Sequence, residues 1–554
     1  MDDNQRRLDA IRRSSDENEN HVIDEFVAGR LSRGDFLRRG AVVGLSMPLM
    51  GAIVAACGGA NSTSSSPASG SSGPAKPGGT IKAGIITPSG AIDPVTVLDQ
   101  GGLDMLAQTG EYLCIANSKS QLVPVLAESW SANTKADVWT FKIRQGVKFH
   151  NGQPLTADDV AYTYKLQSDP KGKSNALSAF NGIVLPAGVQ KVDDFTVAFH
   201  LTAPDANFPY VCSSENYNMI ILPNNYDSSK WEASFIGTGP FKMKSYTAKV
   251  GASFVRNEAY WGKKALPDAT EFTFYDAQQP QILALEAGTI DVVGQFSVQG
   301  GQALLSNSKV SVISVRSSAH RELSMRCDQA PFTDPRVRQA VALTLNRPEI
   351  VQGLFQGKSD LGNDSPFAPI FASTDTSVAQ RAQDLNKAKS LLQAAGHGSG
   401  FSTHLYTETT QEMPAYAQIV KSSASKVGVN IGLTIESPDQ YYSKDWLSGV
   451  MSTVDYGHRS VPNLFLQAPL QSKGTWNAAH FKNSTYDTLS AQYIAALDLQ
   501  AQKTIAGKIE NLLLEQTPVI YAYFYNYLAA TASNVSGVEP TGIGHLFLFN
   551  ASKA

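Results

Sequence analysis

The chain has little charge, little cysteine and no long apolar run. Only 17% of its 554 residues are charged and the formal net charge is -3, so we expect no basic stripe of the kind that binds nucleic acid. The four cysteines are scattered, and no two cysteines or histidines stand at metal-ligand spacing. The apolar stretch at residues 40–56 is rich in glycine and alanine and is interrupted by Pro48, which makes it poor material for a permanent membrane span. We therefore expect a globular protein without a metal or other cofactor.

Signatures of common enzymes are missing as well. GHGSG, residues 396–400, fails the nucleophile-elbow pattern because His397 stands at its first glycine position. QGKS, residues 356–359, ends like a phosphate-binding loop, but Gln352 replaces the first glycine. AHREL, residues 319–323, lacks the second histidine of a zinc-protease helix. No catalytic residue is assigned, and a surface hydrolase without a known motif remains the alternative to a binding protein.

The N-terminal region indicates export. Polar residues 1–39 are followed by the apolar stretch, which ends in VAAC, Val54–Cys57. This ending resembles the lipobox of bacterial lipoproteins, and the resemblance implies cleavage before Cys57 and a lipid on its sulfur. SRGDFLRR, residues 32–39, resembles a twin-arginine signal except that Gly34 stands where the second arginine belongs. The export route is therefore left open, and a short buried helix followed by a cysteine is the structural alternative.

Residues 58–79 consist mainly of glycine, serine, proline and alanine. Such a stretch cannot bury apolar area and is typical of a solvated linker, which would span roughly 25 Å as a flexible coil. A lipid, a linker and a folded body in this order predict a protein anchored at the extracytoplasmic face of a cell membrane.

From residue 80 onward, period-two and helical patterns alternate, which predicts mixed α and β structure. Residues 138–143 and 195–201 alternate as half-buried strands do. Residues 156–166 open with Thr156 and Asp159 in a capping-box arrangement, which predicts a helix. Two more helices are expected at 333–347, with Pro335 near the first helical position, and at 384–396, between a cap at Asp384 and a stop at Gly396. No internal repeat is visible.

Two β-rich runs, residues 310–328 and 518–532, are candidate passages between folding units. If the chain crosses at both, the first lobe comprises residues 80–318 and 526–554, and residues 319–525 form the second lobe. Residues 1–56 and 57–79 then hold the export signal and the lipidated linker.

Six segments, in order, resemble one family of proteins. They are residues 122–130 (LVPVLAESW), 139–160 (WTFKIRQGVKFHNGQPLTADDV), 236–243 (IGTGPFKM), 255–262 (VRNEAYWG), 285–293 (LEAGTIDVV) and 331–347 (PFTDPRVRQAVALTLNR). Together they are similar to the extracellular solute-binding proteins of family 5, which serve peptide, nickel and related ABC importers. The resemblance covers the chain from about Thr80 to its C-terminus.

This resemblance implies an α/β, two-lobed periplasmic-binding-protein-like fold of type II, cluster C, with an additional small domain in the first lobe. It also implies a receptor rather than an enzyme, which captures a peptide-like solute by lobe closure and delivers it to the permease subunits of an ABC importer. We expect this receptor to be a monomer.

In peptide-binding members of the family, an aspartate of the second lobe holds the α-ammonium of the peptide. The closest match here is Met451–Leu466, which gives that role to Asp455. A carboxylate buried by lobe closure would favour an amine, because leaving it unpaired is costly. The alternative is that Asp455 pairs with Arg459 or caps the turn before Pro462.

The sequence departs from the family pattern at two places. HRSV, His458–Val461, replaces a short acidic link, and residues 401–414 lack the arginine that grips the ligand carboxylate in dipeptide binders. That second stretch carries Glu408 and Glu412 instead. If either acid faces the cleft, a polyamine or another cationic amine becomes the alternative solute; if both are surface residues, it does not. An oligosaccharide is a third option.

Further candidates for ligand contact are Tyr456, Arg459, Trp476, Asn477, Tyr112, Asn216 and Asn218. For any of the aromatic and amide side chains, core packing is the alternative. Cys114, Cys212 and Cys327 allow at most one disulfide, and the sequence does not choose the pair.

Overall fold

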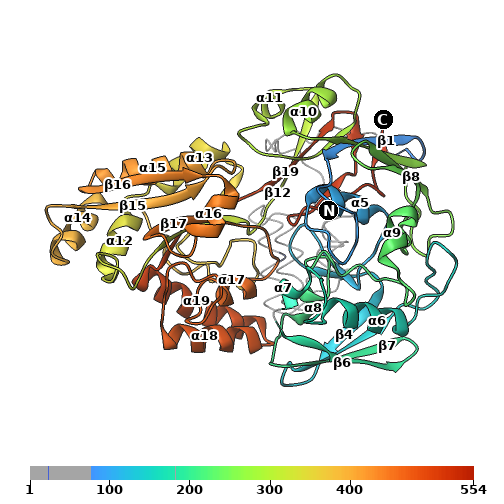
Figure 1. Cartoon of the computed structure of the whole chain (residues 1–554), viewed down its shortest axis with the longest axis horizontal. Coiled ribbons are helices and arrows are strands. Elements are labelled where there is room, and N and C mark those ends of the chain that lie inside the picture. Colours follow the sequence, from blue (N-terminus) through green and yellow to red (C-terminus); the bar gives the residue numbers. More distant parts are fainter. Residues whose placement is uncertain (1–22, 24–75, 181) are drawn as a thin grey trace, which may run out of the picture. The chain divides into compact units, whose positions relative to one another are not determined.

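Two large β-sheets and a separate four-stranded sheet organise the described part of the chain (Figure 1). The computed structural model describes residues 23, 76–180 and 182–554. Apart from Ile23, the predicted export signal, Cys57 and most of the predicted linker lie outside the described residues.

The first large sheet has seven strands. Their order is β12 (Val310–Val315), β19 (Tyr527–Ala532), β11 (Val292–Phe296), β1 (Thr80–Ile86), β10 (Ala269–Tyr275), β9 (Gly251–Arg256) and β8 (Phe241–Thr247). Strand β1 runs parallel to both of its neighbours, and the remaining pairs are antiparallel. The helices of this part are α5 (Gln100–Thr109), α9 (Ser228–Ser234), α10 (Gln278–Glu286) and α11 (Gln302–Ser306).

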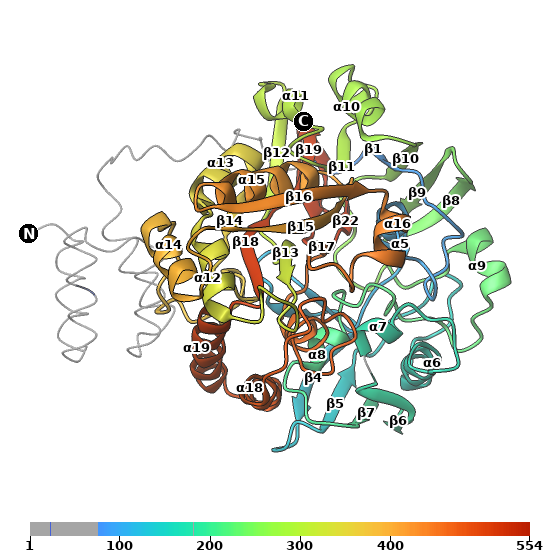
Figure 2. The same ribbon diagram turned by 60° about the vertical axis from the view of Figure 1, so that its left-hand side comes forward.

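The second large sheet has six strands. Their order is β14 (Ser359–Leu361), β18 (Val519–Tyr525), β13 (His320–Met325), β17 (Met451–Tyr456), β15 (Phe401–Glu408) and β16 (Val429–Glu436). Its helices are α12 (Pro335–Leu343), α13 (Arg347–Phe355), α14 (Leu385–Ala394), α15 (Met413–Ser425), α16 (Pro438–Lys444), α17 (Asn463–Gln467), α18 (Ser484–Ala495) and α19 (Leu499–Gln516). Figure 2 shows α13 and α15 lying over this sheet.

This second sheet is buried on both faces. Along β18, Ile520 and Ala522 belong to one apolar cluster, whereas Val519 and Tyr521 belong to another. Because successive side chains of a strand point to opposite faces, each cluster covers one face. A sheet covered on both sides explains why the run VIYAYFY contains no charged residue.

The four-stranded sheet is antiparallel and lies within the first part of the chain. Its order is β4 (Ala127–Ala132), β5 (Val138–Ile143), β7 (Thr196–Leu201) and β6 (Val184–Asp193), accompanied by α6 (Ala157–Gln167), α7 (Leu177–Phe180) and α8 (Phe208–Val211). Three strand pairs of two or three residues complete the structure: β2 (Cys114–Ala116) with β3 (Leu122–Pro124), β20 (Val535–Ser536) with β23 (Ser552–Lys553), and β21 (Glu539–Pro540) with β22 (Leu546–Phe547).

The chain passes between the two large sheets twice. It leaves β12 and enters β13 through residues 316–319, and it leaves β18 and enters β19 through Asn526. Strands β12 and β19 are paired in the first sheet, and β13 and β18 are paired in the second. The two passages therefore lie next to each other.

The predicted elements form where the local signals place them, with one difference in length. Helix α6 begins after Thr156, which forms a full capping box with Asp159, and α14 begins after the cap Asp384. The helix predicted for residues 333–347 begins at Pro335 but ends at Leu343. The prediction is too long because Asn346 caps a new helix, α13.

Cys114, Cys212 and Cys327 are free thiols, so the described residues contain no disulfide. None of the helices formed by residues 76–180 and 182–554 has the length and apolar character required to cross a membrane.

Candidate functional site

A cavity of about 330 Å³ lies beside the two passages between the large sheets. This volume falls in the range of small-molecule sites. The cavity, called the main cavity below, is lined by Leu98, Gln100, Leu103, Tyr217, Gln295–Gln299, Ser317, Ala319, Phe355, Gln411, Glu412, Asp455, Gly457–Arg459, Tyr525–Leu528, Gly542 and Ile543. Residues of both large sheets, of both passages and of the segment after β17 therefore contribute to one site.

Asp455 reaches the main cavity from the end of β17. It lies directly opposite Arg321 in the antiparallel pair β13–β17, and opposed residues of such a pair point to the same face. Arg321 Nη1 and Asp455 Oδ1 form an ion pair. The Arg321 side chain is 0% exposed, whereas that of Asp455 is 33% exposed. The aspartate is thus the member of the pair that faces the cavity.

Arg321 is shared by two carboxylates. Its Nε lies 3.0 Å from Glu412 Oε1, and its Nη2 donates to Glu412 Oε2 at 3.3 Å and to Gln411 Oε1 at 3.2 Å. The guanidinium carbon lies 4.4 Å from the centre of the Tyr525 ring. Burial opposes the charged guanidinium, but the neighbouring Asp455, Tyr525 and Glu412 outweigh it and hold the pKa of Arg321 well above its usual value.

One cationic and two anionic side chains leave this cluster with a surplus of one negative charge. Glu412 is 1% exposed and receives a further hydrogen bond from the Tyr523 hydroxyl at 3.0 Å. On Asp455, Oδ1 accepts from both Arg321 and the Tyr525 hydroxyl, the latter at 2.9 Å. Oδ2 of Asp455 receives no hydrogen bond from the described residues. Asp455 Oδ2 can therefore accept a hydrogen bond from a cationic group of a solute, which would balance the surplus negative charge.

Arg459 lines the same cavity but makes no ion pair with Asp455. Its Nη1 donates to the carbonyl of His458 at 2.7 Å. Burial lowers the pKa of Arg459, while Tyr217 and Glu215 act in the opposite direction. The alternative in which Asp455 pairs with Arg459 is wrong, because Arg321 occupies that position. Asp455 and Arg459, one acidic and one basic, thus both line the main cavity and lie only four positions apart in the chain.

Glu408 and Glu412 are both buried, so the alternative in which both are surface residues is wrong. Glu412 lines the main cavity, but its charge is offset by Arg321. Glu408 accepts hydrogen bonds from the hydroxyls of Tyr442 at 2.9 Å and Thr410 at 2.7 Å and does not line the cavity. The acids that would favour a dication are therefore already engaged within the protein.

The aromatic and amide candidates do not line the main cavity. Tyr456 points to the face of β17 opposite Asp455 and packs 5.9 Å from Trp476 and 6.0 Å from Phe465, measured between ring centres. Strand alternation explains this position, since neighbouring residues cannot share a face. Asn477 holds its own loop by donating to the carbonyls of Gln471 and Phe481.

The candidates from the first part of the chain are also buried within the fold. The Tyr112 hydroxyl donates to Tyr217 O at 2.9 Å and lies 2.8 Å from His545 Nε2. Asn218 Nδ2 donates to the carbonyls of Pro94 and Val97. Asn216 lines a second, smaller cavity.

Sequence reasoning missed Arg321, Gln411 and Tyr525. The signal for Arg321 was present, because HRELSM is a buried strand that contains three consecutive ionisable residues. A run of charges in a fully buried strand requires partners within the protein. The identity of those partners depends on strand pairing and could not be inferred from the run itself.

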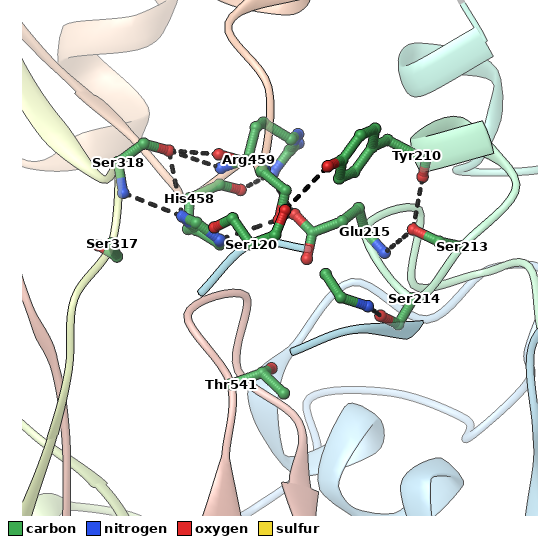
Figure 3. A network of polar contacts seen from close by, with 12 residues as sticks. Ser120, Tyr210, Ser213, Ser214, Glu215, Ser317, Ser318, His458, Arg459 and Thr541 are labelled. Atoms are coloured by element: carbon green, nitrogen blue, oxygen red, sulfur yellow. Dashed lines mark hydrogen bonds and ion pairs between the residues drawn. The ribbon is translucent and has the colours of Figure 1, made fainter. Parts of the chain in front are cut away.

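A chain of polar contacts links the segment after β17 to the first part of the chain (Figure 3). The backbone N–H of Ser318 donates to His458 Nδ1 at 2.9 Å, and His458 Nε2 lies 3.7 Å from Glu215 Oε2. The backbone N–H of Ser460 donates to the same Glu215 oxygen at 2.7 Å. Burial, followed by the nearby Arg459, lowers the pKa of His458 to about 3, and burial raises the pKa of Glu215 to about 7.

This Ser318–His458–Glu215 arrangement differs from a hydrolytic triad. The Ser318 hydroxyl donates to Arg459 O at 2.6 Å and accepts from the Arg459 N–H at 2.9 Å. The hydroxyl also lies 3.1 Å from His458 Nδ1, but its one proton goes to the Arg459 carbonyl, and Ser318 is fully buried. A nucleophilic serine needs a hydroxyl that can reach a substrate, so these contacts fix the loop rather than activate a nucleophile. Residues 76–180 and 182–554 contain no cluster of three or more His, Cys, Asp or Glu suited to a metal ion.

Comparison with known proteins assigns the family. A sequence model of the bacterial extracellular solute-binding proteins, family 5 (middle part), matches residues 121–466. The chain belongs to this family. Its members are binding proteins rather than enzymes, and the family resemblance expected from the sequence is confirmed.

Individual relatives agree with this assignment. The chain is 25% identical to heme-binding protein A of Haemophilus influenzae over 469 residues, which are 78% of this chain and 84% of that protein. It is also 25% identical to the dipeptide-binding protein DppE of Bacillus subtilis over 468 residues, with the same coverage. The solved structure of HbpA2 from Haemophilus parasuis superimposes with a TM-score of 0.77 at 22% identity, covering 86% of this chain and all of that one. The predicted two-lobed periplasmic-binding-protein fold is confirmed.

Proposed function

We propose that this family 5 protein is the receptor of an ABC importer and that it captures a short peptide or a peptide-like zwitterion in the main cavity. The observation that supports this proposal most directly is the surplus negative charge at Asp455, which lines the cavity with a side chain that is 33% exposed. Relatives that are named dipeptide-binding, murein peptide-binding and di/tripeptide-binding proteins support the same class of solute.

The charges of the site suit a zwitterion. Asp455 Oδ2 would accept a hydrogen bond from the α-ammonium group of the solute. Arg321 and Tyr525 would hold the Asp455 side chain in place through its other oxygen. Arg459 would face the carboxylate or a main-chain carbonyl, and it would take the part of the arginine that residues 401–414 lack. A polyamine has less support, because Glu408 and Glu412 are engaged within the protein.

We further infer that two lobes close on the solute. The first lobe comprises residues 80–318 and 526–554, and the second comprises residues 319–525. A permease would recognise the closed form. Closure around a solute contributes to apparent affinity only to the extent that the solute binds the closed form better. The protein would act as a monomer, held at the extracytoplasmic face by a lipid on Cys57. A hydrolytic function has no support from the Ser318 contacts.

Mass spectrometry of the solute released by denaturing the purified protein tests this proposal. We expect an amine-bearing compound with at least one amide bond, recovered intact. Calorimetry with dialanine and N-acetyl-dialanine then isolates the ammonium contact, and acetylation should weaken binding about 30-fold or more. Recovery of a neutral sugar, or equal affinities for the two peptides, would contradict the proposal.

A further inference from the structure

Gln411 lines the main cavity in a backbone conformation that is uncommon for residues other than glycine. Its φ is 44°, in the left-handed region where a side chain raises the conformational energy. Nine residues other than glycine have a positive φ in the described part of the chain, and Gln411 is the one among them that lines the main cavity. Because strained residues cluster at ligand sites, this position points to a role for Gln411 in binding.

The residues on either side hold Gln411 in this conformation. The Thr410 hydroxyl donates to Glu408 Oε2 at 2.7 Å, and Glu412 is paired with Arg321. The Met413 backbone N–H donates to the carbonyl of Thr410 at 3.0 Å and closes the turn. The turn before α15 is thus fixed by contacts that do not involve the Gln411 side chain.

Arg321 orients the carboxamide of Gln411. Arg321 Nη2 donates to Gln411 Oε1 at 3.2 Å. A guanidinium carries only hydrogen-bond donors, so the oxygen of the carboxamide must be the atom that faces Arg321. The amide nitrogen Nε2 is thereby turned away from Arg321, and it donates to no residue of the described ranges 76–180 and 182–554.

This amide group differs in exposure from the other contacts of Arg321 on the same turn. Gln411 is an exposed residue at the wall of the main cavity, whereas Glu412 is 1% exposed. A donor on an exposed side chain that has no partner within the protein is available to a solute. The main cavity thus offers a donor in addition to the carboxylate of Asp455.

The same guanidinium binds Gln411 and Asp455. Arg321 Nη1 donates to Asp455 Oδ1, and Nη2 donates to Gln411 Oε1. Because a guanidinium is planar and rigid, these contacts hold a carboxylate and an amide side by side. The N-terminus of a peptide carries the complementary pair, an ammonium group that donates and, on the second carbon from the nitrogen, a carbonyl oxygen that accepts.

We propose that Gln411 is a specificity-determining residue, whose Nε2 donates a hydrogen bond to the carbonyl oxygen of the residue that carries the solute's ammonium group. The inference rests on the proposed function, because it takes the ammonium group to bind at Asp455. Asp455 by itself would accept any amine, whereas Asp455 and Gln411 together select an α-aminoacyl group. A simple amine would leave Gln411 Nε2 without a partner.

The charge of the cluster explains why an amide suits position 411. Arg321 is already shared by the carboxylates of Asp455 and Glu412. An amide accepts from Arg321 without adding a third negative charge, and it places N–H groups on its other side. A residue that served only to pair with Arg321 would not need those N–H groups.

Calorimetry with dialanine and its (E)-alkene isostere tests this contact. The isostere replaces the amide bond by a carbon–carbon double bond, so it keeps the shape, the ammonium group and the carboxylate but lacks the carbonyl oxygen. Wild-type protein should bind dialanine about tenfold more tightly than the isostere. In Gln411→Glu, which keeps an oxygen for Arg321 but has no N–H to donate, this ratio should fall about threefold or more. The added charge acts on the ammonium group of both ligands alike and therefore cancels in the ratio.

Gln411→Met is the second variant. It has nearly the same length as glutamine but no charge and no donor, and it should lower the ratio in the same way, so the result does not depend on the protonation of a new carboxyl group. Gln418→Glu is the matched control, because Gln418 is an exposed residue of α15 outside the main cavity. This control should leave the ratio unchanged.

NMR of the Gln411 side-chain amide gives a readout that a purely structural role would not move. Its signals, identified by their absence from Gln411→Glu, should shift more with dialanine than with the isostere. An unchanged ratio in both variants, or equal shifts with the two ligands, would overturn the inference and leave the proposed function standing. If dialanine does not bind the wild-type protein, the proposed function itself fails, and the role of Gln411 fails with it.

Discussion

Arg321 and Asp455 stand directly opposite each other on β13 and β17 and form an ion pair although 134 positions separate them in the chain. Glu412 completes the cluster on the buried side. One guanidinium thus holds two carboxylates, one enclosed in the protein and one turned toward the main cavity. The same contact stabilises the second sheet and orients the residue proposed to bind the solute.

Replacing Arg321 by methionine should strongly destabilise the protein. The change removes the cation that pairs with two buried or half-buried carboxylates, and breaking such a pair from one side costs about 3–5 kcal/mol. Urea unfolding of the purified protein measures this loss. Arg336→Met is the matched control, because its ion pair with Asp334 is exposed, and it should change the unfolding free energy far less. Equal effects of the two changes would show that the Arg321 cluster has no special stabilising role.

Replacing Asp455 by asparagine should weaken the binding of dialanine about 30-fold or more, because the solute ammonium loses its charged partner. The variant keeps the shape of the side chain and leaves Arg321 paired with Glu412. N-acetyl-dialanine serves as the control ligand, since it has no ammonium and should bind both proteins equally. Unchanged calorimetric affinity for dialanine would mean that Asp455 is structural.

Local signals were sufficient to predict three of the helices, α6, α12 and α14, and two alternating strands, β5 and β7. The capping box of Thr156 and Asp159 marks the beginning of α6, and the N-cap Asp384 marks the beginning of α14. Such features depend on neighbours within one turn and can be recognised in the sequence directly. The family resemblance added the arrangement of the lobes.

The candidate site was harder to predict, because it depends on pairing between distant strands. Asp455 was found through the family motif, but its partner Arg321 lies on β13 and no local signal connects the two. Tyr456 was placed in the cleft beside Asp455, although strand alternation alone would have turned it to the opposite face. Arg459 was also a candidate. That it lines the main cavity could be seen only once the segment after β17 was placed beside the two passages between the sheets.

Replacing Arg459 by glutamine should remove the preference for a free carboxylate. Wild-type protein is expected to bind dialanine more tightly than dialanine amide, by about tenfold. In the variant the two affinities should converge, while the dependence on the free ammonium group persists. Calorimetry with the two peptides provides the measurement. If the ratio for acid and amide is the same in both proteins, Arg459 does not contact the carboxylate.

Replacing Cys57 by serine should release the protein from the membrane. The proposed lipid is attached through the sulfur of Cys57, and stable anchoring requires more than one acyl chain. Fractionation of cells after labelling with a radioactive fatty acid should show the wild-type protein labelled in the membrane fraction and the variant unlabelled. Cys327→Ser is the matched control and should keep both the label and the location. Labelling of the Cys57 variant would reject this attachment site.

Glu215 should make the stability of the folded protein depend on pH. Burial raises its pKa from 4.5 to about 7, so the folded protein binds a proton that the unfolded chain releases in this range. Its contribution is therefore fully present below pH 4.5 and is lost as the pH rises toward 7. Glu215→Gln keeps an acceptor for the Ser460 N–H but cannot ionise. Relative to this variant, wild-type protein should lose unfolding free energy between pH 5 and about pH 7.5.

The groups that face Glu215 set the control for this measurement. His458 approaches from the segment after β17, Arg459 lies beside it, and Tyr210 comes from α8. His458 acts with the opposite sign, because burial lowers its pKa from 6.5 to about 3, and the stability it contributes is gained as the pH rises from 3 to 6.5. In wild-type protein, the gain from His458 partly offsets the loss from Glu215 as the pH rises. His458→Asn should therefore make the loss of unfolding free energy with rising pH steeper, whereas Glu215→Gln should remove that loss. Parallel pH profiles for wild-type protein and Glu215→Gln in chemical unfolding would show that Glu215 titrates alike in the folded and unfolded states, contrary to its buried position.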